Sequence, residues 1–264
     1  MSPDAPIGII DSGIGCFTVL RALRQVLPKE NWLVLQDREY APYGQMTDAQ
    51  IIRRTSSLVQ RLQDLGVKAV ILACHSSSSL AHAYLSKHFQ IPIIDLLRPT
   101  ARGLAHNFLD QNILWLATTA SIRANKLPVL SQSYGFHGNI VPVACPGWVD
   151  AIESDTWRTT AFTRAVHDLV GSSLLQFKNK KAHILLGCTH YPWIKTILSD
   201  FLYDQYVCID PADWVAHASK VLLDNSGLMN SNDRQGMIKI LDSARIPVIW
   251  RNYCQTEYTE VELV

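Results

Sequence analysis

The sequence has almost no excess of either charge, since 24 lysines and arginines stand against 23 aspartates and glutamates. A protein dedicated to nucleic acid normally carries a basic patch or stripe, so no nucleic-acid partner is predicted. No apolar run approaches the ~18 consecutive residues that a membrane helix requires, and no membrane association is predicted. The N-terminus, MSPDAPIGIIDSG, has neither the basic start nor the apolar segment of a secretory signal peptide. A cytoplasmic location is therefore expected.

Phosphate-binding and disulfide motifs are missing as well. The chain contains no GxGxxG and no P-loop, the two glycine-rich patterns that cradle nucleotide phosphates. Its six cysteines are widely spaced and form no CxxC pair, and without a secretion signal they are expected to be reduced thiols. No metal, nucleotide or other cofactor is predicted.

Short apolar runs rich in valine, isoleucine and leucine alternate with amphipathic segments along the chain. Continuous apolar strands separated by helices are typical of parallel sheets that are covered on both faces. The chain is therefore predicted to be an α/β protein. The expected strands are residues 7–11, 31–37, 69–74, 91–95, 112–118, 140–145, 182–188 and 206–210, and the clearest expected helices are residues 18–27, 48–66 and 159–177.

Two segments of the chain resemble each other weakly. ILACHSSS (71–78) and LLGCTHYP (185–192) both end an apolar run in a cysteine that polar residues follow. This likeness predicts two pseudo-symmetric, three-layer α/β lobes with mainly parallel sheets and an active site in the cleft between them.

The boundaries of the two lobes follow from the order of the apolar runs. The first lobe is expected to comprise residues 1–97 and about 210–264, and the second lobe residues 98–209. The tail after residue 225, which contains the strand-like run IPVIW (246–250), is expected to be peripheral.

Cys74 and Cys188 end the two similar runs, and in parallel sheets ligands bind outside the carboxyl ends of the strands. Each cysteine could still be a plain core residue, because free cysteine is among the most buried residue types. With His75 and His190 they could form a zinc site, although their spacings differ from those of structural zinc sites. One cysteine could instead be the nucleophile of a Cys–His hydrolase, with His190 as its base.

A third functional alternative uses both thiols to carry protons. Racemisation next to a carboxylate removes a proton from one face of a carbon and returns a proton to the other face. It needs a base and an acid on opposite sides of the substrate, and two facing cysteines can serve as thiolate and thiol. Asp11, near one cysteine, and His190, near the other, could accept or supply the proton.

Five motifs resemble, in order, those of the glutamate racemases, which are cofactor-independent enzymes of the aspartate/glutamate racemase superfamily. The resemblance implies two α/β lobes with the active site between them. It also implies interconversion of L- and D-glutamate, which supplies D-glutamate for peptidoglycan, and a homodimer as the expected assembly. The motifs are IGIIDSGIG (7–15), APYG (41–44), ACHSSSS (73–79), CPGWVDAIE (145–153) and LLGCTHYP (185–192).

The same resemblance implies roles for individual residues. Cys74 and Cys188 would be the two acid/base residues, with Asp11 assisting Cys74, and with His190, together with Glu153, assisting Cys188. The residues assigned to the substrate site are Ser12, Pro42, Tyr43, Gly44, His75, Ser76, Thr118, Ser121, Glu153 and Thr189.

The chain departs from the family pattern at several positions, among them two motifs near the expected site. The family typically has CNT where this chain has Cys74, His75 and Ser76, and its usual DTARAPYG reads DREYAPYG (37–44) here. A histidine in place of asparagine is bulkier and can titrate near neutrality. Racemisation of aspartate or of several amino acids therefore stays open, as does a catalytically weakened relative that acts as a binding or regulatory protein.

Overall fold

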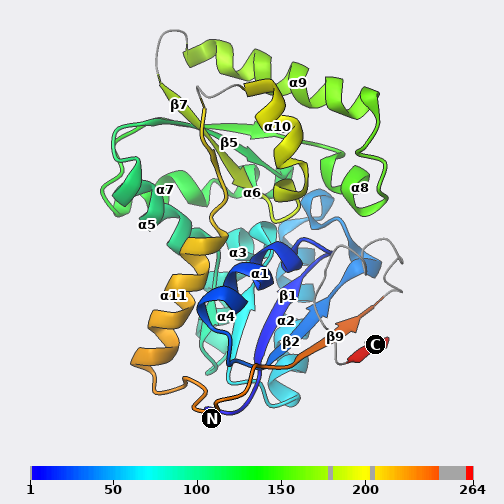
Figure 1. Ribbon diagram of the computed structural model, residues 1–264, viewed down its shortest axis with the longest axis vertical. Helices are drawn as coiled ribbons and strands as arrows, with labels where there is room; N and C mark the ends of the chain where they lie inside the picture. Colours follow the sequence, from blue (N-terminus) through cyan, green and yellow to red (C-terminus); the bar gives the residue numbers. More distant parts are fainter. Residues whose placement is uncertain (1, 178–180, 203–205, 244–259, 264) are drawn as a thin grey trace.

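Two separate parallel sheets organise the chain, one in the lower half and one in the upper half of Figure 1. The computed structural model describes residues 2–177, 181–202, 206–243 and 260–263, and in this part of the chain every strand pairing is parallel. Helices lie on both faces of each sheet. The predicted two-lobed α/β fold is confirmed.

The first sheet has the strand order β10-β9-β2-β1-β3-β4. One face packs against α1, with α11 beside it, and the other packs against α2 and α4. Side chains alternate along a strand, so Ile7 and Ile9 face α1 while Ile10 faces α2. The elements are β1 (Ile7–Asp11), β2 (Trp32–Gln36), β3 (Ala69–Leu72), β4 (Ile93–Ile94), β9 (Ile238–Asp242), β10 (Glu260–Leu263), α1 (Cys16–Val26), α2 (Asp48–Asp64), α4 (His82–His88) and α11 (Ala212–Asn225).

The second sheet has the strand order β6-β5-β7-β8. Trp115 packs on the side of α5 and α7, whereas Leu114 and Leu116 pack on the side of α8, α9 and α10. The elements are β5 (Asn112–Ala117), β6 (Ile140–Ala144), β7 (Ala182–Gly187), β8 (Cys208–Ile209), α5 (Leu97–Asn107), α7 (Lys126–Ser133), α8 (Trp148–Glu153), α9 (Thr160–Leu174) and α10 (Lys195–Leu202).

The expectation that the tail after residue 225 is peripheral is wrong. Strand β9 lies inside the first sheet, between β2 and β10, and Ile238, Ile240 and Leu241 are buried. The strand-like run at 246–250 lies outside the described residues. The tail therefore extends the first sheet at the edge formed by β2.

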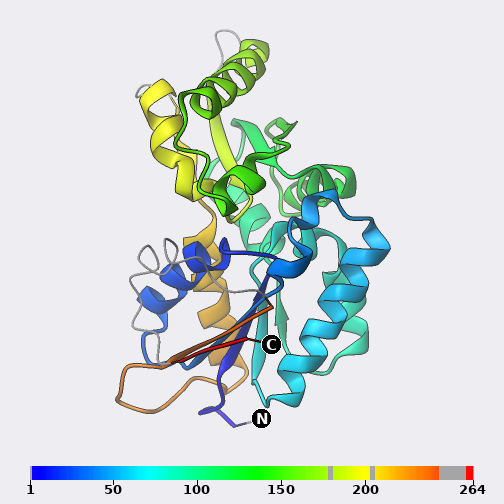
Figure 2. The same ribbon diagram turned by 90° about the vertical axis from the view of Figure 1, so that its right-hand side faces the viewer.

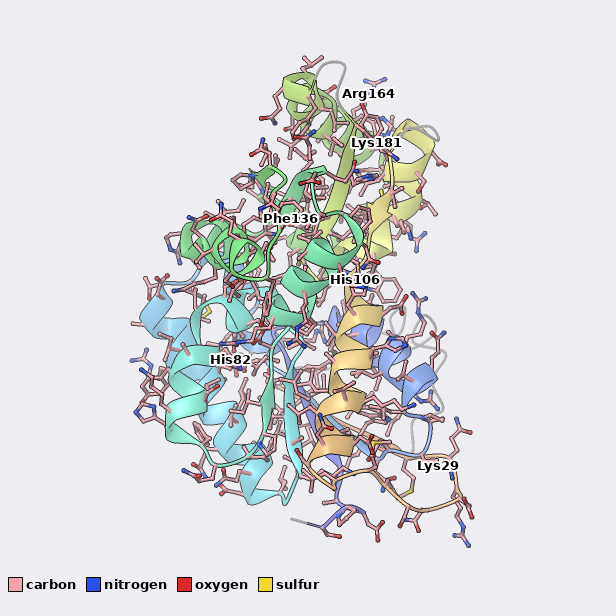
Figure 3. The ribbon with its side chains drawn as sticks, turned by 90° about the vertical axis from the view of Figure 1, so that its left-hand side faces the viewer. Lys29, His82, His106, Phe136, Arg164 and Lys181 are labelled. Atoms are coloured by element: carbon pink, nitrogen blue, oxygen red, sulfur yellow. The ribbon has the colours of Figure 1, made fainter. Side chains whose placement is uncertain are left out.

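The chain passes between the sheets twice, through α5 and through α11. The proposed first lobe, residues 1–97 and about 210–264, takes in all strands of the first sheet, and the proposed second lobe, 98–209, takes in all strands of the second. Figures 1 and 2 agree in placing the second lobe above the first along the long axis. In Figure 3, Lys29 marks the outer end of the first lobe, and Arg164 and Lys181 mark that of the second.

Short helices follow several strands and close their carboxyl ends. Most of them begin within a few residues of the end of a buried strand, and Figure 1 shows two of these, α3 and α6, near the junction of the lobes. Among the described residues, no helix has the length and apolar character needed to span a bilayer. The short helices are η1 (Arg38–Tyr40), η2 (Tyr43–Gln45), α3 (His75–Leu80), α6 (Thr119–Ala124) and η4 (Tyr191–Ile194), and a further one, η3 (Leu175–Phe177), follows α9.

Candidate active site

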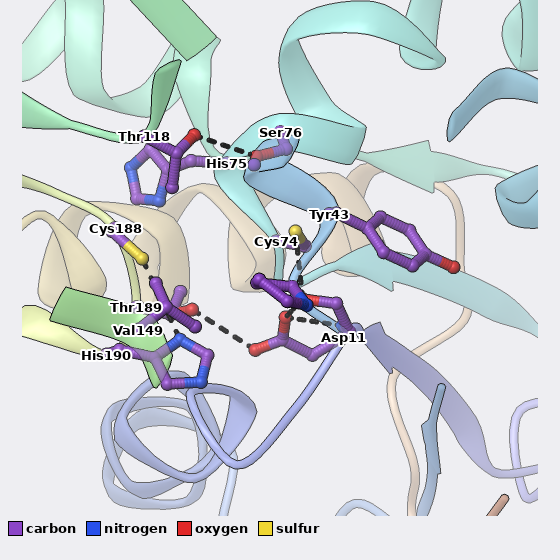
Figure 4. A pocket seen from close by; sticks show the side chains of 13 residues that line it. Asp11, Tyr43, Cys74, His75, Ser76, Thr118, Val149, Cys188, Thr189 and His190 are labelled. Atoms are coloured by element: carbon purple, nitrogen blue, oxygen red, sulfur yellow. Dashed lines mark hydrogen bonds between the residues drawn. The ribbon is translucent and has the colours of Figure 1, made fainter. Parts of the chain in front are cut away.

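A nearly closed pocket lies where the carboxyl ends of the two sheets meet, and its empty space, open solvent included, is about 260 Å³. The enclosed part of that space has room for about one water molecule in this structure. Figure 4 shows the side chains that converge on it. The first lobe contributes Asp11, Ser12, Pro42, Tyr43, Gly44, Cys74, His75 and Ser76, and the second contributes Thr118, Val149, Cys188, Thr189 and His190.

Cys74 forms the first-lobe side of the pocket together with Asp11 and Ser12. It follows β3 and precedes α3, and its Sγ lies 3.7 Å from the Ser12 hydroxyl. Asp11 ends β1 and accepts a hydrogen bond of 2.6 Å from the backbone N–H of Ser12. Burial and the nearby Asp11 raise the pKa of the Cys74 thiol to about 12. Cys74 is therefore a protonated thiol at neutral pH.

Asp11 is fully buried, and burial raises its pKa to about 7. The positive charge of His190, the backbone N–H of Ser12 and the hydroxyl of Thr189 all act in the opposite direction. A carboxyl group that titrates near neutrality can take up or release a proton at physiological pH. The structure thus places such a group beside the Cys74 thiol.

Cys188 forms the second-lobe side of the pocket with His190. Its Sγ lies 3.7 Å from His190 Nδ1, and His190 Nε2 lies 2.7 Å from Oε1 of Glu153. Burial alone would lower the pKa of His190, but its hydrogen bonds with Cys188 and Glu153 raise the pKa well above its ordinary value. Burial works against the charge of Glu153 too, yet the hydrogen bond from His190 holds the pKa of that carboxyl below its usual range. The carboxylate of Glu153, the imidazolium of His190 and the sulfur of Cys188 thus form a chain of hydrogen bonds.

Hydrogen bonds at the pocket join the two lobes directly. The Thr189 hydroxyl donates to Oδ2 of Asp11 at 3.1 Å. The hydroxyls of Ser76 and Thr118 lie 2.9 Å apart, one from each lobe. The structure is therefore a closed arrangement in which both lobes complete the site.

The turn that contains Pro42, Tyr43 and Gly44 forms one wall of the pocket. The Tyr43 hydroxyl donates to Asp37 at 2.5 Å, and Arg54 donates to the same carboxylate. A Cβ at Gly44 would lie only 3.0 Å from Cβ of Thr118. Glycine therefore lets the turn approach the second lobe closely.

His75 is 5% exposed and borders the pocket, and neither of its ring nitrogens has a hydrogen-bond partner among the described residues. Burial lowers its pKa to about 3, so the ring is neutral. Buried polar groups in folded proteins nearly always have partners. A ligand in the pocket can supply those that the ring nitrogens lack.

All of the site residues predicted from the sequence line this pocket except Ser121 and Glu153. Ser121 is fully buried behind Thr118, whose hydroxyl donates to its Oγ at 3.0 Å. Glu153 lies behind His190.

Two residues that contribute to the site were not predicted from the sequence. Val149 lines the pocket and could have been found from the CPGWVDAIE motif, whereas Arg38 contacts Glu153 from a distant part of the chain and has no local signal.

The zinc alternative can be compared with the positions of the side chains. In the described part of the chain, no group of three or more histidine, cysteine, aspartate or glutamate residues is arranged to hold a metal ion. The cysteines in that part, which include Cys74 and Cys188, are free thiols.

The fold and the pocket define a two-lobed α/β protein that brings one thiol from each lobe to a shared site. No protein-family model matches the chain. The glutamate racemase of Herpetosiphon aurantiacus is 30% identical over 240 residues, which cover 91% of this chain and 93% of that one. The glutamate racemase of Clostridium perfringens is 29% identical over 250 residues, which cover 91% of each chain. A crystal structure of glutamate racemase from Francisella tularensis in complex with D-glutamate aligns with a TM-score of 0.87 and 26% identity, over 99% of this chain and 98% of that one. The chain belongs to the glutamate racemase family.

Proposed function

We propose that the protein interconverts L- and D-glutamate and thereby supplies D-glutamate for peptidoglycan synthesis. The observation that carries this proposal is the pair of thiols, Cys74 and Cys188, that line one small pocket from opposite lobes. Membership of the glutamate racemase family supports the reaction. The crystal structure of the Francisella tularensis relative, which contains D-glutamate, supports the substrate.

The proposed reaction moves two protons and needs no cofactor. The thiolate of one cysteine takes the α-proton, so a C–H bond breaks and an S–H bond forms. The electron pair left on the α-carbon is delocalised into the neighbouring carboxylate. The S–H of the other cysteine then gives its proton to the opposite face of the carbon, and the two sulfurs have exchanged roles.

The Cys74 half of the reaction uses Asp11. Because burial raises the pKa of Asp11 to about 7, this carboxylate can receive the proton when Cys74 must become a thiolate and can return it afterwards. Ser12 contacts both residues and keeps the sulfur next to the carboxylate.

The Cys188 half uses His190 and Glu153. An imidazolium 3.7 Å from the sulfur favours a negative charge there, and the carboxylate behind it keeps the ring in place. The two thiols thus have different neighbours. Cys74 lies near a carboxyl group that can be neutral or anionic, and Cys188 lies near a cationic ring.

Glutamate brings two carboxylates and an ammonium group, and the pocket offers donors and an acceptor for them. The hydroxyls of Ser76, Thr118 and Thr189 lie on its walls, and the turn at Gly44 exposes backbone there. His75 adds a neutral ring with one donor and one acceptor. We infer that these groups, with Ser12, Pro42 and Tyr43, hold the substrate between the two sulfurs, and that Ser121 supports Thr118 from behind.

Exchange of the α-proton in D₂O tests the proposal. Both enantiomers of glutamate are expected to lose the α-proton signal in ¹H NMR and to interconvert, whereas L- and D-aspartate are expected to react far more slowly. Faster exchange of aspartate would reassign the substrate. Exchange of none of the four would refute racemisation and leave a binding or regulatory role for the protein.

The two cysteine variants test the two-base chemistry. Cys74→Ala and Cys188→Ala are each expected to lose racemisation by about 10²-fold or more, because each removes a group that transfers a proton in the transition state. If either variant racemised glutamate at close to the wild-type rate, that cysteine would not be one of the two bases.

Family resemblance also leads us to propose a homodimer that acts in the cytoplasm. Sedimentation equilibrium of the purified chain tests the assembly, and fractionation of the source cells tests the location. A monomer across the concentration range, or recovery from a membrane or extracellular fraction, would contradict these two proposals.

A further inference from the structure

Glu153 belongs to the second lobe, but the first lobe supplies most of its recorded contacts. Its Oε1 accepts from the backbone N–H of Ile14 at 2.8 Å as well as from His190. Its Oε2 lies 3.4 Å from Nε of Arg38, which follows strand β2. Both carboxylate oxygens are therefore bound to the first lobe while one of them holds the histidine that contacts Cys188.

Arg38 is itself held in place by a second carboxylate. Its Nη1 lies 3.2 Å from Oδ2 of Asp242, at the carboxyl end of β9, and the Asp242 side chain is fully buried. The Arg38 side chain is only 12% exposed. A guanidinium is a rigid, planar group with five donors, so fixing one edge against Asp242 also fixes the edge that faces Glu153.

The geometry points to Arg38 as a positioning residue for the Cys188 half of racemisation, an inference that rests on the proposed function. Arg38 orients Glu153, Glu153 orients His190, and His190 contacts the Cys188 sulfur. Without the guanidinium, the carboxylate of Glu153 can turn about its last side-chain bond and move its Oε1 away from His190.

The hydrogen bonds that start at Arg38 lead to one of the two thiols, Cys188. The recorded side-chain partners of Cys74 and Asp11 are Ser12 and Thr189, and Arg38 is bonded to none of these four residues.

Single-thiol backgrounds separate the two halves of the reaction. In Cys74→Ala the remaining Cys188 can exchange the α-proton of one enantiomer for deuterium without inversion, and in Cys188→Ala the remaining Cys74 can do so for the other enantiomer. Adding Arg38→Gln to Cys74→Ala is expected to slow exchange by about ten-fold or more, because the loss of a hydrogen bond to a charged group has an effect of about this size. Adding it to Cys188→Ala is expected to slow exchange by less than about two-fold. Arg38→Lys, which keeps the charge, is expected to restore part of the rate.

The ion pair between Arg123 and Asp48 provides a matched control. It also joins the two lobes, at 2.6 Å, but it lies on the surface and has no recorded contact with His190. Arg123→Gln is expected to leave both exchange rates unchanged. Equal slowing of both halves by Arg38→Gln, or no slowing of either, would overturn the inference.

A second measurement does not depend on activity. The ring proton between His190 Nε2 and Glu153 is expected to give a low-field ¹H NMR signal in the wild-type protein, assigned by its loss in Glu153→Gln. Arg38→Gln is expected to shift or broaden this signal, and Arg123→Gln is expected to leave it in place. A signal unaltered by Arg38→Gln would overturn the positioning role, whereas wild-type protein without any exchange of glutamate would instead overturn the proposed function.

Discussion

Replacing Asp11 by asparagine is expected to stabilise the fold at neutral and alkaline pH while it removes activity. The amide has nearly the same shape as the carboxyl group and can keep its hydrogen bonds. Its oxygen can accept from the backbone N–H of Ser12, and its NH₂ group can donate to the Thr189 hydroxyl, which now donates to the carboxylate. What the substitution removes is the buried negative charge.

The size and sign of the effect follow from the pKa of Asp11, which is about 7 in the folded protein against an ordinary value of 3.8. Between these pH values the unfolded chain has released the proton and the folded protein still holds it. The wild-type fold therefore loses stability as the pH rises from about 3.8, and the loss is complete above about pH 7. A pKa difference of about three, at ~1.4 kcal/mol for each pKa unit, corresponds to about 4 kcal/mol at most. Asparagine has no such loss because it does not titrate.

Urea unfolding at a series of pH values from about 4 to about 8 measures this difference. The free energy of unfolding of Asp11→Asn minus that of the wild type is expected to rise by up to about 4 kcal/mol across the series. Asp224→Asn, at an exposed position on α11, is the control and is expected to give a constant difference. If the Asp11→Asn difference were constant as well, Asp11 would not have the raised pKa on which its proposed catalytic role depends.

Three further substitutions test other parts of the structure. Gly13→Ala would place a Cβ 1.9 Å from Oε1 of Glu153, and the resulting displacement is expected to slow glutamate racemisation by about 10²-fold and to lower the urea midpoint, whereas a wild-type rate would contradict this. Lys68→Met leaves the buried carboxylate of Glu30 without its ion-pair partner and is expected to lower the free energy of unfolding by about 3–5 kcal/mol; a change below about 1 kcal/mol would contradict this. Because burial lowers the pKa of His75 to about 3, His75→Asn is expected to change KM by the same factor from about pH 5 to about pH 9, and a factor that varies with pH would show that the ring titrates.

The positions of the strands and of the pocket could largely be predicted from the sequence. Continuous apolar runs such as IGIID and AVIL can be buried on both faces only in a covered parallel sheet, and the residues that follow such runs meet at one end of the sheet. Cys74 and Cys188 lie in one pocket for this reason. Strand β9 was missed because its run, IKILD, is short, carries a lysine and an aspartate, and follows a polar segment.

The contacts behind the pocket could not be predicted in the same way. Arg38 bonds to residues 115 and 204 positions away, and no local spacing connects them. The environment of His75 could not be predicted from the sequence either. Among the described residues its ring nitrogens have no hydrogen-bond partner, and this follows from three-dimensional packing rather than from any local pattern. The motifs indicated which residues line the pocket. The residues that contact those from behind, such as Arg38, are brought there only by the fold.

The closed pocket also affects how readily its two cysteines are oxidised. Peroxides and electrophiles attack thiolates rather than thiols, and they must first reach the sulfur. Cys74 and Cys188 are each only 6% exposed, and Cys74 keeps its proton at neutral pH because its pKa is about 12. The burial of Cys74 and the proton on its sulfur are therefore expected to make it react more slowly with peroxide than an exposed thiolate does.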